Sequence, residues 1–206
     1  MRPETNVWEA GVTGSENIAF RALVHDDLVL LKRWLEDPDV APWYETDSTE
    51  LEALREEYTA ALRGEGPDRC FIIRIDGEDA GYIQAYVIDD HPAYARQLQV
   101  DPGAVGIDLF IGEPAMRNRG LGAQVIGAFL RQVVFGEMGA EVAIIAPEPG
   151  NARAVRAYEK VGFVWQKTVH IVDESPANTG DEYVMRLTRE AFLAAQPSMV
   201  RDNRTG

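Results

Sequence analysis

Apolar residues recur along the chain with two different spacings, and these spacings divide it into predicted strands and helices. Short runs of alternating or continuous apolar residues indicate strands, whereas apolar residues three and four positions apart indicate helices. The predicted strands are 18–24, 70–75, 80–88, 105–112, 142–146, 163–172 and 182–187. The predicted helices are 26–35, 48–63, 119–135, 151–160 and 188–195. Because strands and helices are interspersed, this order indicates a mixed α/β sheet with flanking helices.

Polar residues between the apolar runs set the predicted boundaries. Asp26 and Ser48 stand where the side-chain caps of the first two helices are expected. Asp76-Gly77 predicts the turn of a hairpin between the second and third strands. The polar stretch 89–102 is predicted to be a loop.

The length of the chain indicates one domain. Its 206 residues are enough for a single sizeable core. We expect this domain to span 17–196, between an N-terminal tail (1–16) and a C-terminal tail (197–206). The sequence has no apolar stretch near the roughly 20 residues that a membrane helix needs, and the polar N-terminus does not resemble a secretory signal. We therefore expect a cytoplasmic protein, either monomer or homodimer, that does not bind membranes.

The charge of the chain excludes one class of partner. The formal net charge is −14, and nucleic-acid binding needs a basic face. Residues 1–100 carry 21 acidic and 9 basic side chains, against 13 and 11 in residues 101–206. This asymmetry has two open interpretations, which are solubility and a negative field that attracts a cationic ligand.

Cysteine and histidine usage gives no sign of metal or disulfide chemistry. The single cysteine, Cys70, begins an apolar run and is predicted to be a buried structural thiol. The three histidines are far apart in the sequence and have no cysteine near them, so no metal site is expected.

The segment between the fourth predicted strand and the third predicted helix has the composition of an anion site. It reads Arg117-Asn118-Arg119-Gly120-Leu121-Gly122-Ala123. Glycines let the backbone approach a ligand closely, and the first N–H groups of a helix attract phosphate. The third glycine of the dinucleotide fingerprint is missing, because position 125 is Val, and the Lys of a P-loop is missing as well.

A second motif lies one helix and one strand further on. Residues 151–163 fit the pattern Asn-x-x-Ala-x-x-x-Tyr-x-x-x-Gly-Phe, with Asn151 first and Tyr158 at the aromatic position. Together with Arg-x-x-Gly-x-Gly at 117–122, this pattern resembles the GNAT superfamily of N-acetyltransferases. The resemblance implies an α+β GNAT fold, with a mixed central sheet of about seven strands, splayed fourth and fifth strands, and flanking helices.

The same resemblance implies a binding mode for acetyl-coenzyme A. Backbone groups of Leu109, Phe110 and Ile111 would bond the pantetheine arm in the gap between the splayed strands. The residues implied to hold the rest of the cofactor are Arg117, Arg119, Gly120, Leu121, Gly122, Ala123, Asn151 and Arg153. Tyr158 would direct its hydroxyl at the sulfur and protonate the leaving thiolate.

A carboxylate in the middle of the fourth predicted strand suggests the acceptor chemistry. Asp108 alternates with Ile107 and Leu109, so it shares a face with Phe110. A mid-strand carboxylate is unfavourable unless it has a partner or a function. Two interpretations stay open: Asp108 forms a salt bridge to a neighbouring strand, or it holds and deprotonates an incoming ammonium group.

The run from Asp101 to Pro114 narrows the resemblance to the aminoglycoside 6′-N-acetyltransferases, as do Gly81–Tyr86 and the Trp43-Tyr44 pair. This resemblance implies Asp108 as the general base and a polycationic aminoglycoside as the acceptor. The implied acceptor-binding residues are Trp43, Tyr44, Tyr86, Asp108 and Asp181.

The sequence departs from that family at two places. Ala146 stands where the family often has an acid, and residues 93–96 replace its aromatic and acidic loop. We hypothesise that Asp173, Glu174, Asp181 and Glu182 substitute for the missing acids.

Three other functions stay open at this point. A siderophore-type lysine N-acyltransferase would have His at the Asp108 position. A protein or peptide N-terminal acetyltransferase belongs to the same superfamily. A non-catalytic acyl-CoA sensor would have lost Tyr158 or Asp108, and the chain has both.

Overall fold

The computed structural model describes residues 7–9, 16–44, 46, 48–172 and 179–195. These residues form one eight-stranded sheet, in the order β1-β2-β3-β4-β5-β6-β8-β7. The strands are β1 (Val7–Glu9), β2 (Ile18–Ala22), β3 (Asp68–Ile75), β4 (Glu78–Val87), β5 (Val105–Ile111), β6 (Val142–Ile145), β7 (Val164–Ile171) and β8 (Gly180–Thr188). Only the β5–β6 pair is parallel among the strand pairs of the described residues. The mixed α+β sheet is thus confirmed, with one strand more than the seven expected.

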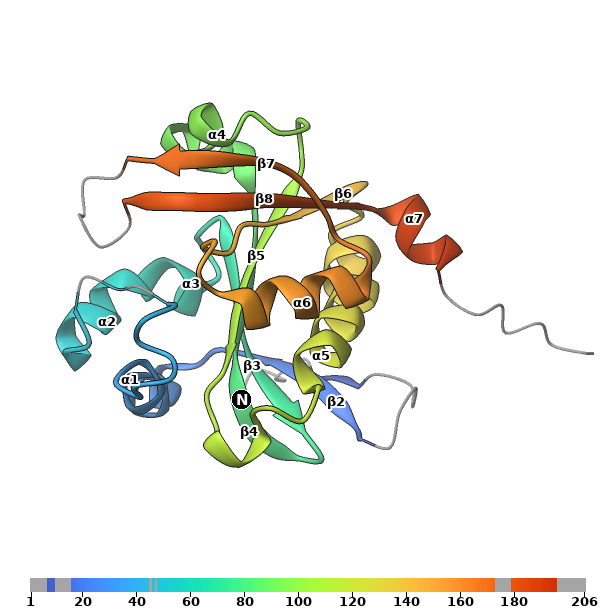
Figure 1. The fold of residues 1–206 in the computed structure, drawn as a ribbon. Coiled ribbons are helices and arrows are strands. Elements are labelled where there is room, and N and C mark those ends of the chain that lie inside the picture. The colour runs from blue at the N-terminus through green and yellow to red at the C-terminus, as the bar shows by residue number, and fades with distance from the viewer. Residues whose placement is uncertain (1–6, 10–15, 45, 47, 173–178, 196–206) are drawn as a thin grey trace, which may run out of the picture.

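Helices cover both faces of this sheet (Figure 1). They are α1 (Leu28–Leu35), α2 (Leu51–Glu57), α3 (Thr59–Arg63), α4 (Pro92–Leu98), α5 (Leu121–Phe129), α6 (Ala152–Val161) and α7 (Arg189–Ala194). The π-helical segment η4 (Leu130–Glu137) continues α5, and the short 3₁₀ turns are η1 (His25–Asp27), η2 (Ile88–Asp90) and η3 (Pro114–Met116).

The alternation of side chains along β3 divides the core into two layers. Phe71 and Ile73 pack with α5, α6 and α7 on one face of the sheet. Cys70 and Ile72 pack with α1 and α2 on the other face. A third cluster joins α4 to β6, β7 and β8. Successive strand residues point to opposite faces, so one apolar run such as 70–75 supplies both layers.

The predicted N-terminal tail contains a strand. Val7–Glu9 pairs antiparallel with β2, through Val7↔Arg21 and Glu9↔Ala19. The expectation of a tail over all of 1–16 was therefore wrong at this strand. Three residues carry too short a pattern for periodicity to reveal, and their pairing with β2 decides the conformation.

The predicted loop 89–102 contains a helix. Pro92 opens α4 at its first turn, where its missing N–H costs nothing, and Leu98 is buried at the end. Tyr94 and Ala95 pack against the third cluster. Packing of this single short apolar face stabilises a helix that its polar sequence did not indicate.

Helix starts differ from the sequence predictions by a few residues. Asp27, rather than Asp26, accepts the N–H of Val24 at 2.9 Å. The helix expected at 48–63 begins at Leu51 and is interrupted at Tyr58 between α2 and α3. The hairpin turn is confirmed at Asp76 and Gly77, which have φ angles of 52° and 87°.

Candidate active site

The parallel strands β5 and β6 separate soon after they meet. Val105 pairs with Ala143 and Gly106 with Ile144, whereas β5 runs on to Ile111 without further β6 partners in the described part of the chain. The predicted divergence of these strands is confirmed. A cavity of about 830 Å³ opens at this divergence.

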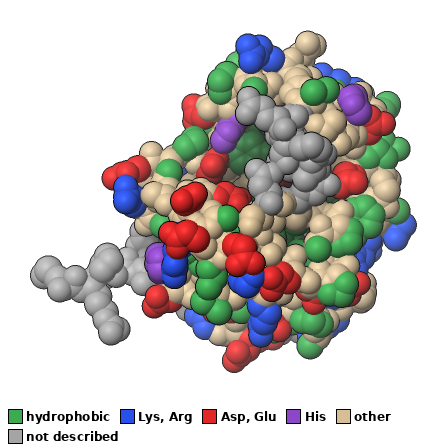
Figure 2. Space-filling model, turned by 90° about the vertical axis from the view of Figure 1, so that its left-hand side faces the viewer, with side chains coloured by type: hydrophobic (Ala, Val, Ile, Leu, Met, Phe, Trp, Pro, Cys, Tyr) green, Lys and Arg blue, Asp and Glu red, His purple; other side chains and the backbone are tan. Residues whose placement is uncertain are grey.

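Two groups of residues line the cavity from opposite sides of β5. The first, called here the acidic wall, consists of Asp39, Glu57, Asp68, Asp108, Asp181 and Glu182. The second, called the helical wall, consists of Gly120, Leu121, Gly122, Ala123, Asn151, Arg153, Arg156, Tyr158 and Lys160, from the starts of α5 and α6 and along α6. Acidic side chains gather on the face shown in Figure 2, the side of the molecule where α1 and α2 lie in Figure 1. Glu148 also lines the cavity, beside Asn151, but most of the acids belong to the acidic wall and the helical wall contributes Arg153, Arg156 and Lys160, so the cavity is electrostatically polarised.

The start of α5 has the features of an anion site. Gly120, directly before the helix, has a φ of 78°, which favours glycine. No side chain of the described residues caps the first turn of α5, so its N–H groups face the cavity side without an internal acceptor. A Cβ on Gly122 would meet only Ala157, at 3.9 Å, which leaves an open approach to the backbone.

The Arg117 side chain has partners within the protein. It is 9% exposed, and its guanidinium donates to Asp37 at 2.7 Å, Asp39 at 3.1 Å and the Ile111 carbonyl at 2.9 Å, and also to the Gly112 carbonyl. Its guanidinium is thus already bonded inside the protein, although Arg117 also lines the cavity, and its contact with phosphate stays a prediction.

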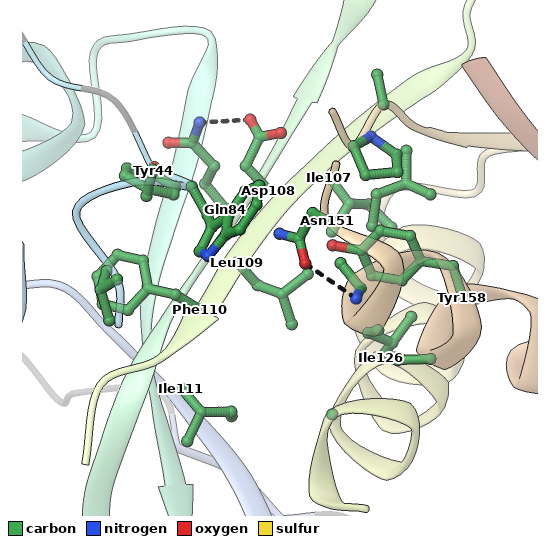
Figure 3. Close-up of a pocket in the computed structure, with 18 of the residues that line it drawn as sticks. Tyr44, Gln84, Ile107, Asp108, Leu109, Phe110, Ile111, Ile126, Asn151 and Tyr158 are labelled. Atoms are coloured by element: carbon green, nitrogen blue, oxygen red, sulfur yellow. Dashed lines mark hydrogen bonds between the residues drawn. The ribbon is translucent and has the colours of Figure 1, made fainter. Parts of the chain in front are cut away.

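The other predicted cofactor-binding side chains differ in whether they line the cavity. Arg119 is absent from the cavity lining that the described residues form, and it pairs with Glu16 at 2.7 Å. Arg153 lines the cavity and donates to Asn118 at 3.3 Å. Asn151 caps α6 by accepting the N–H of Ala154 at 3.1 Å, and Figure 3 places it beside Tyr158.

Asp108 lies on β5 with two hydrogen-bond donors around its carboxylate. Gln84, directly opposite on β4, donates from Nε2 to Oδ2 at 2.8 Å, and Tyr86 provides a second side-chain hydrogen bond. Burial raises the pKa of Asp108 above the ordinary aspartate value, and these hydrogen bonds oppose the rise. The described residues give Asp108 no cationic partner at salt-bridge distance, so the salt-bridge interpretation of this residue is not supported.

Gln84 is a site residue that was not predicted from the sequence. Its Oε1 accepts the Tyr82 hydroxyl at 2.7 Å, and the fully buried Tyr82 also contacts Cys70 Sγ at 3.0 Å. Because Oε1 is occupied by a donor, the amide nitrogen is directed at Asp108. Burial raises the pKa of the Cys70 thiol to about 12, in line with the predicted structural thiol. Alternation along β4 places Tyr82, Gln84 and Tyr86 on one face, and this signal was readable in the sequence.

Tyr158 extends from the helical wall toward β5. Figure 3 shows its hydroxyl pointing from α6 toward β5, where Asp108 and Leu109 lie. Burial raises the pKa of Tyr158 well above its usual value, and the Asp108 charge adds to the rise. The hydroxyl thus keeps its proton at neutral pH and is a donor.

Two of the three predicted aromatic acceptor residues, Tyr44 and Tyr86, lie near Asp108. The Tyr44 ring meets Phe110 edge-on, with ring centroids 4.9 Å apart. Tyr86 packs on Gly106, where a Cβ would come within 2.6 Å of its ring. Trp43 is 41% exposed and lines the cavity.

Further polar residues complete the acidic wall. Asp181 lines the cavity and pairs with His170 at 2.7 Å, and Glu182 accepts the Tyr94 hydroxyl at 2.8 Å. Asp68, which was not predicted from the sequence, pairs with His91 at 2.8 Å. Asp173 and Glu174, proposed from sequence as replacement acids, lie outside the described residues.

Two structural findings concern metals and membranes. The described residues contain no cluster of three or more His, Cys, Asp or Glu side chains arranged to hold a metal ion. None of their helices is long and apolar enough to cross a bilayer.

Comparison with known proteins places these features in a family. The model for the acetyltransferase (GNAT) domain matches residues 24–171. The aminoglycoside N(6')-acetyltransferase type 1 of Klebsiella pneumoniae is 29% identical over 184 residues, which cover 88% of each chain. A kanamycin resistance protein of Rhizobium radiobacter is 34% identical over 94 residues, 46% of this chain and 81% of that one.

Solved structures agree with this assignment. The aminoglycoside acetyltransferase AAC(6')-Ib superposes with TM-scores of 0.75 in complex with coenzyme A and 0.74 in complex with coenzyme A and kanamycin. Both are 28% identical and cover 87% of this chain and 99% of theirs. Since the family model spans well over half of the sequence, this chain belongs to the GNAT acetyltransferase family.

Proposed function

We propose that this protein transfers the acetyl group of acetyl-CoA to a primary amine of a polycationic small molecule, the 6′-amine of an aminoglycoside. The observation that carries the proposal is the placement of Asp108 and Tyr158 on opposite sides of the gap between β5 and β6. One is a carboxylate that can accept a proton and the other a hydroxyl that can donate one. The proposal extends to this chain the activity named for its relatives.

The residues present fit acetyl-CoA. Beyond Gly106 the β6-facing edge of β5 has no strand partner in the described structure, so its backbone groups near Leu109 are available to the amides of a pantetheine arm, whereas the Ile111 carbonyl already accepts Arg117 Nε. The uncapped start of α5 is available to a diphosphate. The cations of the helical wall that face the same space are Arg153, Arg156 and Lys160.

The acidic wall fits a polycationic acceptor. Six carboxylates line that side of the cavity, and their joint field concentrates and orients a cation. Tyr44 and Tyr86 add aromatic surface beside Asp108 for the apolar faces of a sugar ring.

The mechanism assigns proton transfers to both reacting side chains. Bound acetyl-CoA supplies the thioester whose carbonyl carbon is attacked by the amine. Asp108 holds the incoming ammonium group by charge and takes its proton, which leaves a neutral amine with a free lone pair. Its raised pKa makes it a better base than an exposed aspartate. Tyr158 keeps its hydroxyl proton until the sulfur departs and then donates it to the thiolate, and the resulting tyrosinate takes the second proton that the acetylated nitrogen must lose to become a neutral amide.

A thiol-release assay with acetyl-CoA tests this function. The acceptor panel is kanamycin, tobramycin, N-hydroxylysine and a peptide with a free amine. We expect turnover of the two aminoglycosides, with the product acetylated at the 6′-nitrogen by NMR. Turnover of N-hydroxylysine or the peptide, with silence on both drugs, would reject the aminoglycoside assignment in favour of the other acyltransferase functions.

A further inference from the structure

Arg117 connects the end of β5 to a segment that lies about 80 residues before Arg117 in the sequence. Its side chain is 5% exposed, and its three guanidinium nitrogens all donate to protein oxygens. On one side are the carboxylates of Asp37 and Asp39, in the segment after α1. On the other side are the carbonyls of Ile111 and Gly112, at the end of β5.

One of these segments carries the aromatic acceptor residues. Asp37 organises it, because its carbonyl accepts the N–H groups of Val40 and Ala41, both at 2.9 Å. The carbonyl of Val40 then accepts the N–H groups of Trp43 at 2.9 Å and Tyr44 at 3.1 Å. Two successive hydrogen-bonded turns thus fix the backbone of Trp43 and Tyr44 relative to Asp37.

Both aromatic side chains reach the cavity from this segment. Tyr44 packs against Phe110 on the Asp108 face of β5. The Trp43 ring lies 3.6 Å from the position that a Cβ on Gly150 would take, so it meets the turn before α6. A shift of Asp37 would therefore move both the Tyr44 ring beside β5 and the Trp43 ring beside the turn before α6.

The other segment leads into the anion site. Arg117 is three residues before Gly120, and its own N–H is bonded to the Pro114 carbonyl at 3.2 Å. The contact with Asp37 lowers the pKa of that carboxyl, and the contacts with Asp37 and Asp39 raise the pKa of Arg117, so the pair stays charged. A buried guanidinium with fixed acceptors allows little movement of one segment against the other.

We propose that Arg117 is a positioning residue for the acceptor: it fixes the Trp43–Tyr44 segment to the turn that opens α5, and it does not bind the cofactor phosphates. This inference rests on the proposed function, because it assigns Trp43 and Tyr44 to acceptor binding. It predicts a KM effect on the acceptor, whereas the sequence motif by itself predicts an effect on coenzyme A.

The test compares Arg117→Gln with Asp37→Asn, which weakens the same contact from the other partner and leaves Arg117 paired with Asp39. We expect each variant to raise the KM for kanamycin at least fivefold, and to change the Kd of coenzyme A, measured by calorimetry, less than twofold. Arg189→Gln is the matched control, since it removes the exposed ion pair with Glu141 at 3.4 Å, outside the cavity lining. A coenzyme A Kd raised fivefold or more by Arg117→Gln, with an unchanged kanamycin KM, overturns the inference.

Hydrogen exchange separates this inference from the proposed function. If the native protein acetylates no aminoglycoside, the proposed function fails, and the positional role is read from the amides of residues 37–44. Faster exchange of these amides in Arg117→Gln and Asp37→Asn, with unchanged coenzyme A affinity, supports the proposal that Arg117 holds this segment in place. Native-like exchange over 37–44 in both variants overturns it, whatever the acceptor.

Discussion

The two walls of the cavity are built in different ways. The helical wall uses backbone N–H groups and cations from a contiguous part of the chain, 117–163, and it contains both sequence motifs. The acidic wall collects side chains from the segment after α1 and from α2, β3, β5 and β8. A binding surface made of one local supersecondary unit keeps a readable sequence signature, whereas a surface assembled from distant elements does not.

The largest effect is expected for a substitution at Asp108, in the acidic wall. Asp108→Asn keeps the shape and an acceptor oxygen for Gln84 but removes the base. We expect kcat/KM for kanamycin to fall about 10³-fold, within the usual range for losing a general base. Stopped-flow or steady-state thiol release measures it.

The control for Asp108→Asn is its thermal stability, measured as Tm. Because folding raises the pKa of Asp108, the ionised carboxylate is destabilising at neutral pH, and an amide should leave Tm unchanged or higher. An inactive variant with a lowered Tm would indicate misfolding rather than a lost base. Residual activity above a tenth of the native value would remove Asp108 from the mechanism.

The next effect lies on the helical wall. Tyr158→Phe keeps the ring that packs near Phe163 and removes only the hydroxyl. We expect kcat to fall about 10²-fold with an unchanged Kd for coenzyme A, because the loss is confined to proton donation. An equal fall in kcat and in cofactor affinity would indicate a binding role instead.

A smaller effect tests whether the acidic wall is selective for cations. Asp68→Asn removes a charge beside His91 and leaves the helical wall intact. We expect the KM for kanamycin to rise roughly threefold to tenfold at low salt, and the difference from the native enzyme to shrink at high salt. The Kd of coenzyme A, titrated in both buffers, is the internal control and should not follow the mutation.

The smallest effect is a shift of a pH profile. Gln84→Leu removes the hydrogen bond to the Asp108 carboxylate, which favours the charged form, so the pKa of Asp108 should rise further. Asp108 must be ionised to act as a base, so the acid limb of kcat/KM should move to higher pH. A uniform loss of activity at every pH would mean that Gln84 has only a structural role.

The sequence was informative where local pattern and chemistry coincide. The alternation around Asp108 predicted its face correctly, and the two motifs located the divergence of β5 and β6. The partners of Arg117 were not accessible in the same way, because nothing in a single sequence links position 117 to Asp37. The motif gave this side chain a phosphate role because it considers only neighbours along the chain.

The remaining differences have a similar physical origin. α4 and β1 are short, and their conformation depends on packing or pairing with distant residues rather than on their own periodicity. Asp68 and Glu57 read as ordinary surface acids until the fold places them beside Asp108 in one cavity.

The limited pairing of β5 with β6 has a mechanical consequence for the whole molecule. Only two register positions pair the sheet half β1–β5 with the half β6–β8 in the described residues, and the other contacts between the halves are side-chain contacts, namely packing against α5, the third core cluster and the Asp101–Arg186 pair. A ligand whose amides bond β5 in the gap would act as a surrogate strand and complete an interrupted ladder. We therefore expect the two halves of the sheet to unfold as one cooperative unit when the cofactor is bound, and less cooperatively in the free protein.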